Sequence, residues 1–203
     1  MLWHFDAPNM YKAITYVYKE GAILDEYTTP FGIRRLEFKA GEGFYLNDKN
    51  TLIKGVCLHH DGGLVGAAVP KGVWKRRLQK LKEAGVNGIR LSHNPFSTEF
   101  LDLCDEMGFL VQNELFDEWD YPKDKRENYH DRHTDYISRG YSEHFREWSK
   151  SDLTRTILRD RNHPSVMQWS IGNEIEWTYL HYRFVTGFWK DRKDPQNHDG
   201  TYW

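Results

Sequence analysis

The sequence predicts an α/β fold with parallel strands, preceded by a shorter stretch of β structure. From about residue 52, short apolar strands alternate with amphipathic helices, which is the pattern of parallel α/β proteins. Neither GxGxxG nor GxxxxGK(S/T) follows a predicted strand, which counts against a nucleotide-binding fold. The four strand–helix units fit half of a (β/α)8 barrel and an open doubly wound sheet equally well.

The first 45 residues carry the period-two alternation of β-strands. Ile14, Tyr16 and Tyr18, for example, alternate with Thr15 and Val17. We expect strands at 14–18, 22–27, 30–38, 43–46 and 51–53, with a polar turn at 47–50. These strands are too few to close a sandwich by themselves.

The α/β part follows in order along the chain. We expect strands at 52–58, 87–91, 109–115 and 165–172, and helices at 70–84, 97–108, 141–161 and 176–189. Ser97 suits a helix N-cap, whereas Gly85 and Gly108 suit helix C-termini, where glycine adopts a left-handed conformation without strain. A long polar loop, 116–139, separates the third strand from its helix.

Composition excludes few classes of function. The formal net charge of −2 gives no electrostatic argument for binding nucleic acid or an anionic membrane. Aromatic residues make up 15% of the chain, which suits sugar binding and a large core alike. Cys57 and Cys104 make no disulfide framework, and we expect both to be buried. Neither a signal peptide nor a membrane-spanning run is visible, and the compartment stays unknown.

Polar side chains follow every strand predicted in the α/β part. In a parallel barrel, chemistry gathers at the carboxyl ends of the strands. The candidate site residues there are His59, Arg90, His93, Asn94, Asp117, Glu118, Trp119, Asn173 and Glu174. Glu174 is the candidate acid, because glycoside cleavage needs a carboxylic acid to protonate the leaving oxygen. The alternative for Glu174 is a solvated loop carboxylate.

The other candidates also have two interpretations each. Arg90 suits a forked contact with a carboxylate, and His93 a sugar hydroxyl, but both also suit purely structural roles. Trp119 suits the floor of a sugar subsite, with Asp117 or Glu118 accepting hydroxyl hydrogens; the alternative is that Trp119 anchors the loop to the core.

Three histidines leave a metal-dependent hydrolase open as another class. His59, His60 and His93 contain the nitrogen ligands that zinc prefers. Adjacent histidines on a strand point to opposite faces, however, so they rarely bind one ion together. The pattern therefore disfavours a zinc site.

Taken together, several segments resemble successive blocks of glycoside hydrolase family 2, in the order and at the approximate spacing of that family. These are Phe31–Arg34, Gly43–Asn47, Lys54–Asp61, Gly88–Pro95, Asp117–Trp119 and Arg161–Glu174. The resemblance implies the end of an immunoglobulin-like β-sandwich domain at residues 1–45 and the N-terminal half of a TIM barrel at 46–203.

The resemblance also implies roles for single residues. Glu174 matches the acid/base, and Asn173 the residue that contacts the sugar 2-hydroxyl. His59 and His93 match positions that contact the sugar, and Arg90 matches an arginine that supports the nucleophile. Residues 117–119 match a stretch that lines the substrate. The mechanism implied is double displacement through a glycosyl-enzyme.

The His-His-Asp-Gly-Gly run and the Asp-Glu-Trp run favour the β-galactosidase branch over β-glucuronidase or β-mannosidase. No position matches the nucleophile of the family, so we expect these residues alone to be inactive, and a non-catalytic carbohydrate-binding role stays open. The third strand has Gln112, Asn113 and Glu114 where the family usually has Asp-Glu. The resemblance requires no cofactor, although some relatives use magnesium, and it leaves open a homo-oligomer of the full-length protein.

Overall fold

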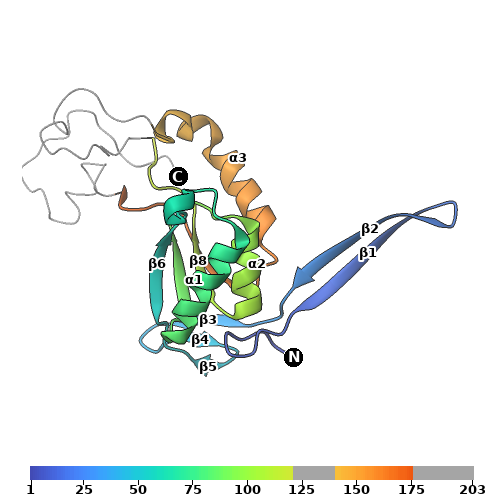
Figure 1. The fold of residues 1–203 in the computed structure, drawn as a ribbon, viewed down its shortest axis with the longest axis horizontal. Helices are drawn as coiled ribbons and strands as arrows, with labels where there is room; N and C mark the ends of the chain where they lie inside the picture. Colours follow the sequence, from blue (N-terminus) through green and yellow to red (C-terminus); the bar gives the residue numbers. More distant parts are fainter. Residues whose placement is uncertain (121–139, 176–203) are drawn as a thin grey trace, which may run out of the picture.

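The computed structural model describes residues 1–120 and 140–175, which form a parallel sheet with a helical cover, a small antiparallel sheet and a projecting hairpin (Figure 1). The parallel sheet has the order β6-β7-β8-β9. Its strands are β6 (Gly55–His59), β7 (Gly88–Ser92), β8 (Leu110–Glu114) and β9 (Val166–Ser170). Sequential order with a helix between neighbours is the arrangement of a (β/α)8 barrel rather than of a doubly wound sheet, in which the order reverses.

Helices cover one face of the parallel sheet. They are α1 (Lys71–Glu83), α2 (Thr98–Met107) and α3 (Ser142–Asp160), with a short 3₁₀ turn, η1 (Gly63–Val65), after β6. The helix expected at 176–189 lies outside the described residues. Gly85 and Gly108 follow α1 and α2 with φ of 82° and 74°, which confirms both as left-handed stops. Ser97 is the N-cap of α2, but its side chain makes no capping hydrogen bond.

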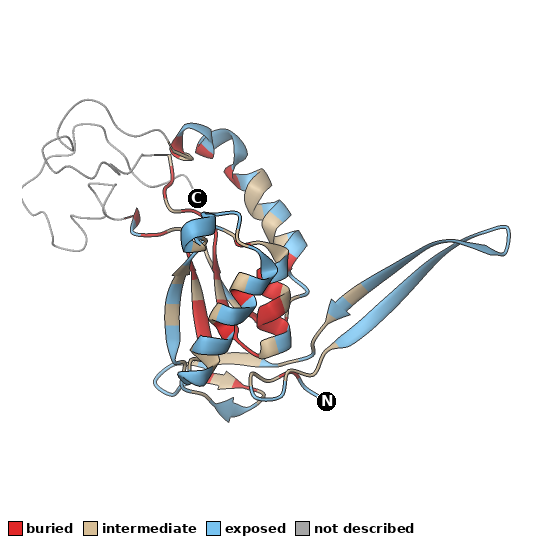
Figure 2. Ribbon diagram, viewed as in Figure 1, coloured by how far each residue is buried: buried red, intermediate tan, exposed pale blue. Residues whose placement is uncertain are grey.

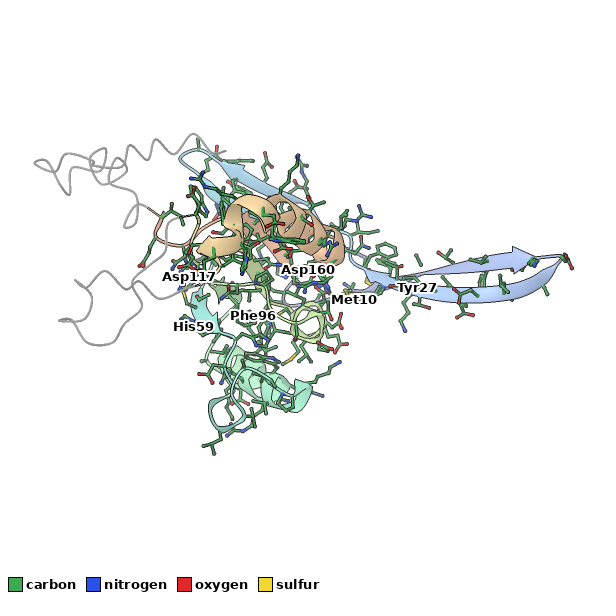
Figure 3. All side chains as sticks on the ribbon, turned by 90° about the horizontal axis from the view of Figure 1, so that it is seen from above. Met10, Tyr27, His59, Phe96, Asp117 and Asp160 are labelled. Atoms are coloured by element: carbon green, nitrogen blue, oxygen red, sulfur yellow. The ribbon has the colours of Figure 1, made fainter. Side chains whose placement is uncertain are left out.

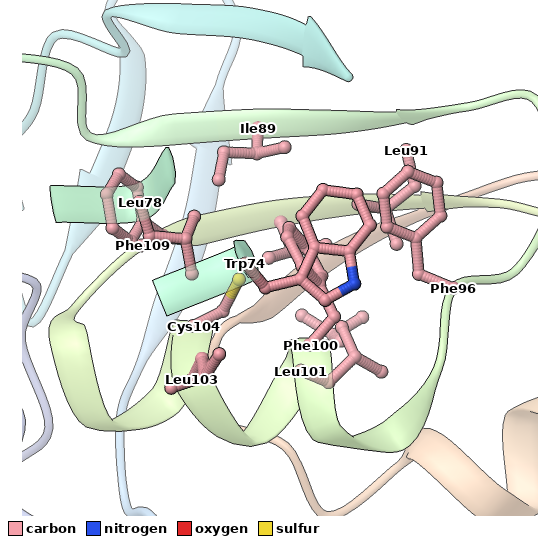
Figure 4. Packing of buried hydrophobic residues seen from close by; sticks show 12 residues of the cluster. Trp74, Leu78, Ile89, Leu91, Phe96, Phe100, Leu101, Leu103, Cys104 and Phe109 are labelled. Carbon is pink, nitrogen blue, oxygen red and sulfur yellow. The ribbon is translucent and has the colours of Figure 1, made fainter. Parts of the chain in front are cut away.

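The main core lies between β7, β8 and the first two helices (Figure 4). Trp74 and Leu78 of α1 and Phe100 of α2 are fully buried there, and Trp74 meets Phe100 edge to face with ring centroids 4.8 Å apart. Each buried side chain of this size contributes roughly 1.5–3 kcal/mol. This packing fixes the sheet on which the polar strand ends are carried.

The hairpin is formed by β1 (Tyr11–Lys19) and β2 (Ala22–Phe31), and almost all of it is exposed on both faces (Figure 2). Strand β2 continues to Phe31, so the expected strand boundaries at 27 and 30 are wrong. Phe31 pairs with Tyr11 and their rings stack at 5.7 Å. Residues 32–35 then leave the hairpin, because Arg34 donates to the carbonyl oxygens of Pro164 and Val166 beside the parallel sheet.

The small sheet consists of β3 (Leu36–Lys39), β4 (Gly43–Leu46) and β5 (Lys49–Asn50). The strand expected at 51–53 is wrong, because the chain turns at Asn47 and Asp48 and pairs immediately at Lys49 and Asn50. Leu46 packs with Trp3 at the amino end of the parallel sheet. This contact joins the N-terminal segment to the bottom of the barrel.

The two cysteines differ in environment. Cys104 is buried in the main core, as expected, and burial raises the pKa of its thiol. Cys57 is exposed among the described residues, which corrects the expectation, because it lies on the face of β6 away from the helices. None of the described helices is both long and apolar enough to span a membrane.

Candidate active site

The polar residues predicted at the strand ends come together at the carboxyl edge of the parallel sheet. His59 ends β6, His93 follows β7, Glu114 ends β8, and Asn173 and Glu174 follow β9. Because the strands are parallel and adjacent, all these termini lie at one edge. In Figure 3 the labelled side chains His59 and Asp117 both lie on the side of the molecule away from the hairpin.

Glu114 is the centre of this arrangement. Its side chain is 1% exposed. Arg90 donates to it twice, from Nε to Oε2 at 3.0 Å and from Nη2 to Oε1 at 2.9 Å. His93 Nδ1 lies 2.6 Å from Oε1, and Ser170 Oγ lies 2.9 Å from Oε2. Four contacts use the four lone-pair positions of an ionised carboxylate.

Arg90 extends the network to the residue before Glu174. Its Nη2 donates to Asn173 Oδ1 at 2.8 Å, and Asn173 Nδ2 donates to Asp117 Oδ1 at 2.9 Å. Burial alone lowers the pKa of Arg90, but its contacts with Cys57 and Glu114 outweigh burial and raise the pKa above its ordinary value. Arg90 is therefore a permanent cation between two polar partners.

Glu174 is exposed and has a positive φ of 49°. Non-glycine residues rarely adopt this left-handed conformation, and such positions cluster at active sites. Asn173, directly before it, is buried, with its backbone N–H donating to Phe116 O at 3.0 Å. Asn173 is therefore anchored at the carboxyl end of β9, and Glu174 next to it is exposed among the described residues.

The histidines do not converge as a three-ligand metal site would require. The rings of His59 and His93 meet edge to face at 5.2 Å. His60 lies on the helical side, where its ring contacts Phe96 at 4.8 Å and Trp74 at 5.4 Å. The expectation that adjacent histidines face opposite ways is confirmed, and the ligand set of the metal-dependent alternative is not assembled.

Two described carboxylates at this edge, Glu114 and Asp117, already have partners within the protein. Magnesium prefers six oxygen ligands in octahedral geometry. Glu114 is saturated by nitrogen and hydroxyl donors, and Asp117 accepts from Asn173. Within residues 1–120 and 140–175, the group that could hold a metal is Asp102, Asp105 and His163, near the amino end of β9. There His163 Nδ1 already lies 2.6 Å from Asp105 Oδ2.

The loop after β8 turns two predicted site residues toward the protein. Glu118 is 1% exposed and accepts a hydrogen bond from the backbone N–H of Ser142, the first residue of α3, at 3.2 Å. Trp119 is 8% exposed, and its indole N–H donates to Ile171 O at 2.9 Å. This geometry favours the interpretation of Trp119 as an anchor, because it ties the β8 loop to the segment that leads to Glu174.

Asp117 and Asn94 also line a cavity of about 480 Å³ beside α3. Its polar lining includes Tyr141, whose hydroxyl donates to Asp152 at 2.5 Å. Burial first, and Asp152 in addition, raise the pKa of Tyr141 above its ordinary value. Asn94 is exposed at the cavity, whereas Asp117 belongs to both the cavity and the Asn173 contact.

Two residues of the network were absent from the predicted site, namely Glu114 and Ser170. Strand alternation contains a signal for them. Arg90 pairs in register with Gln112, and Glu114 pairs with Ser170, so these side chains share the face of the sheet opposite to the helices. Alternation within one strand gives the face of each side chain but not the register between strands. One sequence therefore does not show that Arg90, Glu114 and Ser170 meet.

Comparisons with known proteins agree with this geometry. The family model "Glycosyl hydrolases family 2, TIM barrel domain" matches residues 37–193, and "Glycosyl hydrolases family 2" matches residues 1–34. A β-galactosidase of Bacteroides ovatus is 49% identical over 179 residues, which cover 87% of this chain and 20% of that protein. A putative β-glucuronidase of Formosa agariphila is 43% identical over 173 residues, or 85% of this chain and 16% of that protein.

Solved structures give the same result. The crystal structure of a β-glycosidase from Bacteroides vulgatus superposes with a TM-score of 0.79 at 45% identity, and the match covers 93% of this chain and 23% of that one. The chain thus spans about a fifth of the length of the curated relatives it matches. From the match of the barrel model to most of its residues, we conclude that the chain belongs to glycosyl hydrolase family 2.

Proposed function

We propose that the intact protein is a retaining β-glycosidase that hydrolyses terminal β-D-galactosides, with Glu174 as its general acid/base. The observation that carries this proposal is the anchored pair Asn173–Glu174 at the carboxyl end of β9. Asn173 is held by Arg90 on one side and Asp117 on the other, while Glu174 next to it is exposed. A fixed sugar contact beside an accessible carboxylic acid is what glycoside cleavage requires.

The reaction has two steps in this proposal. Protonated Glu174 donates its proton to the glycosidic oxygen while a carboxylate of the intact protein attacks the anomeric carbon, so that the leaving group departs as an alcohol. The glycosyl-enzyme forms in this step. Glu174, now ionised, then takes a proton from water, and the water oxygen displaces the enzyme carboxylate from the anomeric carbon.

Within the described residues, the attacking carboxylate is not Glu114. Its four lone-pair positions are occupied, and only 1% of the residue is exposed. An anion that accepts four hydrogen bonds is a poor nucleophile, because those bonds must break before it attacks. The family resemblance implies a nucleophile on a later strand, which no position of this chain matches.

One observation supports a galactoside over a glucuronide. The Bacteroides ovatus β-galactosidase shares more identity with this chain than the putative β-glucuronidase of Formosa agariphila does, at 49% against 43%. β-Glucuronidase is the second candidate, and β-mannosidase the third.

We also propose that residues 1–45 complete an immunoglobulin-like sandwich and that 46–203 begin the barrel. The exposure of both faces of the β1–β2 hairpin supports this division. Ile14, Val17, Leu24 and Tyr27 are each about half exposed or more, which is unfavourable for a hairpin that stays uncovered.

Hydrolysis of nitrophenyl β-galactoside, β-glucuronide and β-mannoside by the intact protein tests the function. The galactoside should have the highest kcat/KM. Glu174→Gln should abolish hydrolysis of alkyl galactosides, and added azide should restore turnover of a dinitrophenyl galactoside, because azide needs no general base. Glu106→Gln, an exposed glutamate on α2, is the matched control.

Each result separates the alternatives. A preference for glucuronide would replace the proposed glycone. Full activity of Glu174→Gln would remove this residue from the acid/base role. Sugar binding without hydrolysis in the wild-type protein would instead support a non-catalytic carbohydrate-binding protein.

A further inference from the structure

We propose that Glu114 is a positioning residue that acts through Arg90 to fix the side-chain amide of Asn173. This inference rests on the proposed function, because it gives Asn173 the task of holding the sugar 2-hydroxyl. Glu114 itself would not touch the substrate, since it is 1% exposed and all four of its acceptor positions are used within the protein.

The orientation of the Asn173 amide follows from what its neighbours can donate and accept. A guanidinium has only donors, so Arg90 can bind only the Oδ1 end of the amide. An ionised carboxylate has only acceptors, so Asp117 can bind only the Nδ2 end. Together the two charged residues prevent the amide from rotating by half a turn, which would place donor against donor and acceptor against acceptor.

Arg90 can hold Asn173 only if its own guanidinium is held. The planar fork has five N–H groups in a rigid geometry. Two of them are fixed on Glu114, and Nη2 is shared between Glu114 and Asn173. Glu114 is in turn fixed by Ser170 from β9 and His93 from the loop after β7. Glu114 thus sets the direction in which Nη2 points.

Glutamine at position 114 would disrupt this series of hydrogen bonds while keeping the shape of the side chain. A glutamine has one acceptor oxygen and one NH2 group, and the NH2 group would face the donors of Arg90 or the hydroxyl of Ser170. Arg90 would lose its bidentate partner, and the Asn173 amide would lose its fixed orientation.

The test combines a variant with a change in the substrate. In the intact protein, kcat/KM is measured for nitrophenyl β-galactoside and for its 2-deoxy analogue. The quantity of interest is the kcat/KM of the galactoside divided by the kcat/KM of its 2-deoxy analogue. If Glu114 orients Asn173, this ratio should fall about tenfold in Glu114→Gln, which is the effect of one hydrogen bond lost from the transition state. Arg90→Lys should lower the ratio similarly, because an ammonium cannot hold both partners in a fork.

Asp160→Asn is the matched control. Asp160 is also a fully buried carboxylate, but it bonds Asn113 and Arg159 on the helical side. Its loss should reduce stability without changing the 2-hydroxyl ratio. An unchanged ratio in Glu114→Gln, or an equal change in Asp160→Asn, would overturn the inference.

A structural readout keeps the inference testable whatever the activity. Crystal structures of Glu114→Gln and Asp160→Asn should show a rotated or displaced Asn173 amide in the first variant only. A wild-type protein without galactosidase activity would refute the proposed function. An undisturbed Asn173 in Glu114→Gln would refute this inference separately.

A second variant covers the case in which Glu114→Gln fails to fold. Ser170→Ala removes only one of the hydrogen bonds to Glu114, and the same ratio should fall in the same direction.

Discussion

Asn113 and Glu114 are consecutive residues of β8, and their side chains point to opposite faces of the sheet. Glu114 receives Arg90 at the candidate active site. Asn113 is 0% exposed and donates from Nδ2 to Asp160 Oδ2, at the end of α3, at 3.0 Å. The departure from the Asp-Glu pattern of the family therefore concerns the contact between sheet and helix, and not the charge of the active site.

Asn113→Asp should destabilise the protein. The change would place two carboxylates against each other in a fully buried site. Asp160 already accepts two hydrogen bonds there from the guanidinium of Arg159. We expect a loss of about 2–4 kcal/mol. Thermal and urea unfolding of the intact protein measure it.

Asn113→Asp combined with Asp160→Asn is the control for that prediction, because it exchanges the two groups and restores one donor and one acceptor. The double variant should recover a large part of the lost stability, as expected for residues in direct contact. If the two single effects simply add, the proposed contact has no energetic role.

Gly108→Ala should cost more stability than Gly85→Ala. Both glycines follow a helix with positive φ, so both substitutions carry backbone strain of about 1 kcal/mol. A Cβ on Gly108 would lie 2.0 Å from Phe5 O, whereas nothing lies within 4 Å of a Cβ on Gly85. The difference between the two melting temperatures measures the clash. Equal losses would mean that the Phe5 segment moves aside freely.

Trp119→Phe should lower stability by about 1 kcal/mol while keeping the aromatic packing. The lost interaction is the indole N–H donation to Ile171 O, in the segment that leads to Asn173 and Glu174. Phenylalanine still packs against Phe145, whose ring centroid lies 6.2 Å away. Chemical unfolding measures the loss. Phe145→Leu, which keeps the indole donor, separates packing from hydrogen bonding.

Local patterns predicted the described strands and helices of the α/β part well, because short apolar runs mark the strands, and glycine or proline follows the helices. The ends of α1 and α2 were predictable from the glycines that follow them. The location of the candidate site at the carboxyl strand ends also followed from local information, because parallel topology brings those ends together.

Features that depend on contacts between distant residues were not predictable. Cys57 is exposed among the described residues because it lies on the face of β6 away from the helices, and which face the helices cover depends on contacts between distant residues. Glu118 faces the start of α3 rather than the strand ends, because Ser142, which is 24 positions away in the sequence, donates to it. Apolar alternation in the hairpin predicted strands correctly but gave no sign that both faces are exposed among the described residues.

Protonated His163 should increase the free energy of unfolding, and this contribution should decline as the pH rises. Its ring is largely buried beside Asp105, with Nδ1 at 2.6 Å from the carboxylate. Burial alone lowers the pKa of His163, but the hydrogen bond and charge of Asp105, with further contributions from Asp102 and Asp160, raise it above the ordinary value of 6.5. A raised pKa means that folding favours the protonated ring.

The contribution of His163 is therefore fully present below about pH 6.5, the pKa of the unfolded chain, and is lost as the pH rises through the higher pKa of the folded protein. His163→Asn keeps an N–H donor near Asp105 but cannot titrate. The difference in unfolding free energy between wild type and this variant should be largest near about pH 5.5 and shrink toward about pH 9. A difference that is constant over this range would show that His163 remains neutral in the folded protein, and that its contact with Asp105 is an ordinary hydrogen bond.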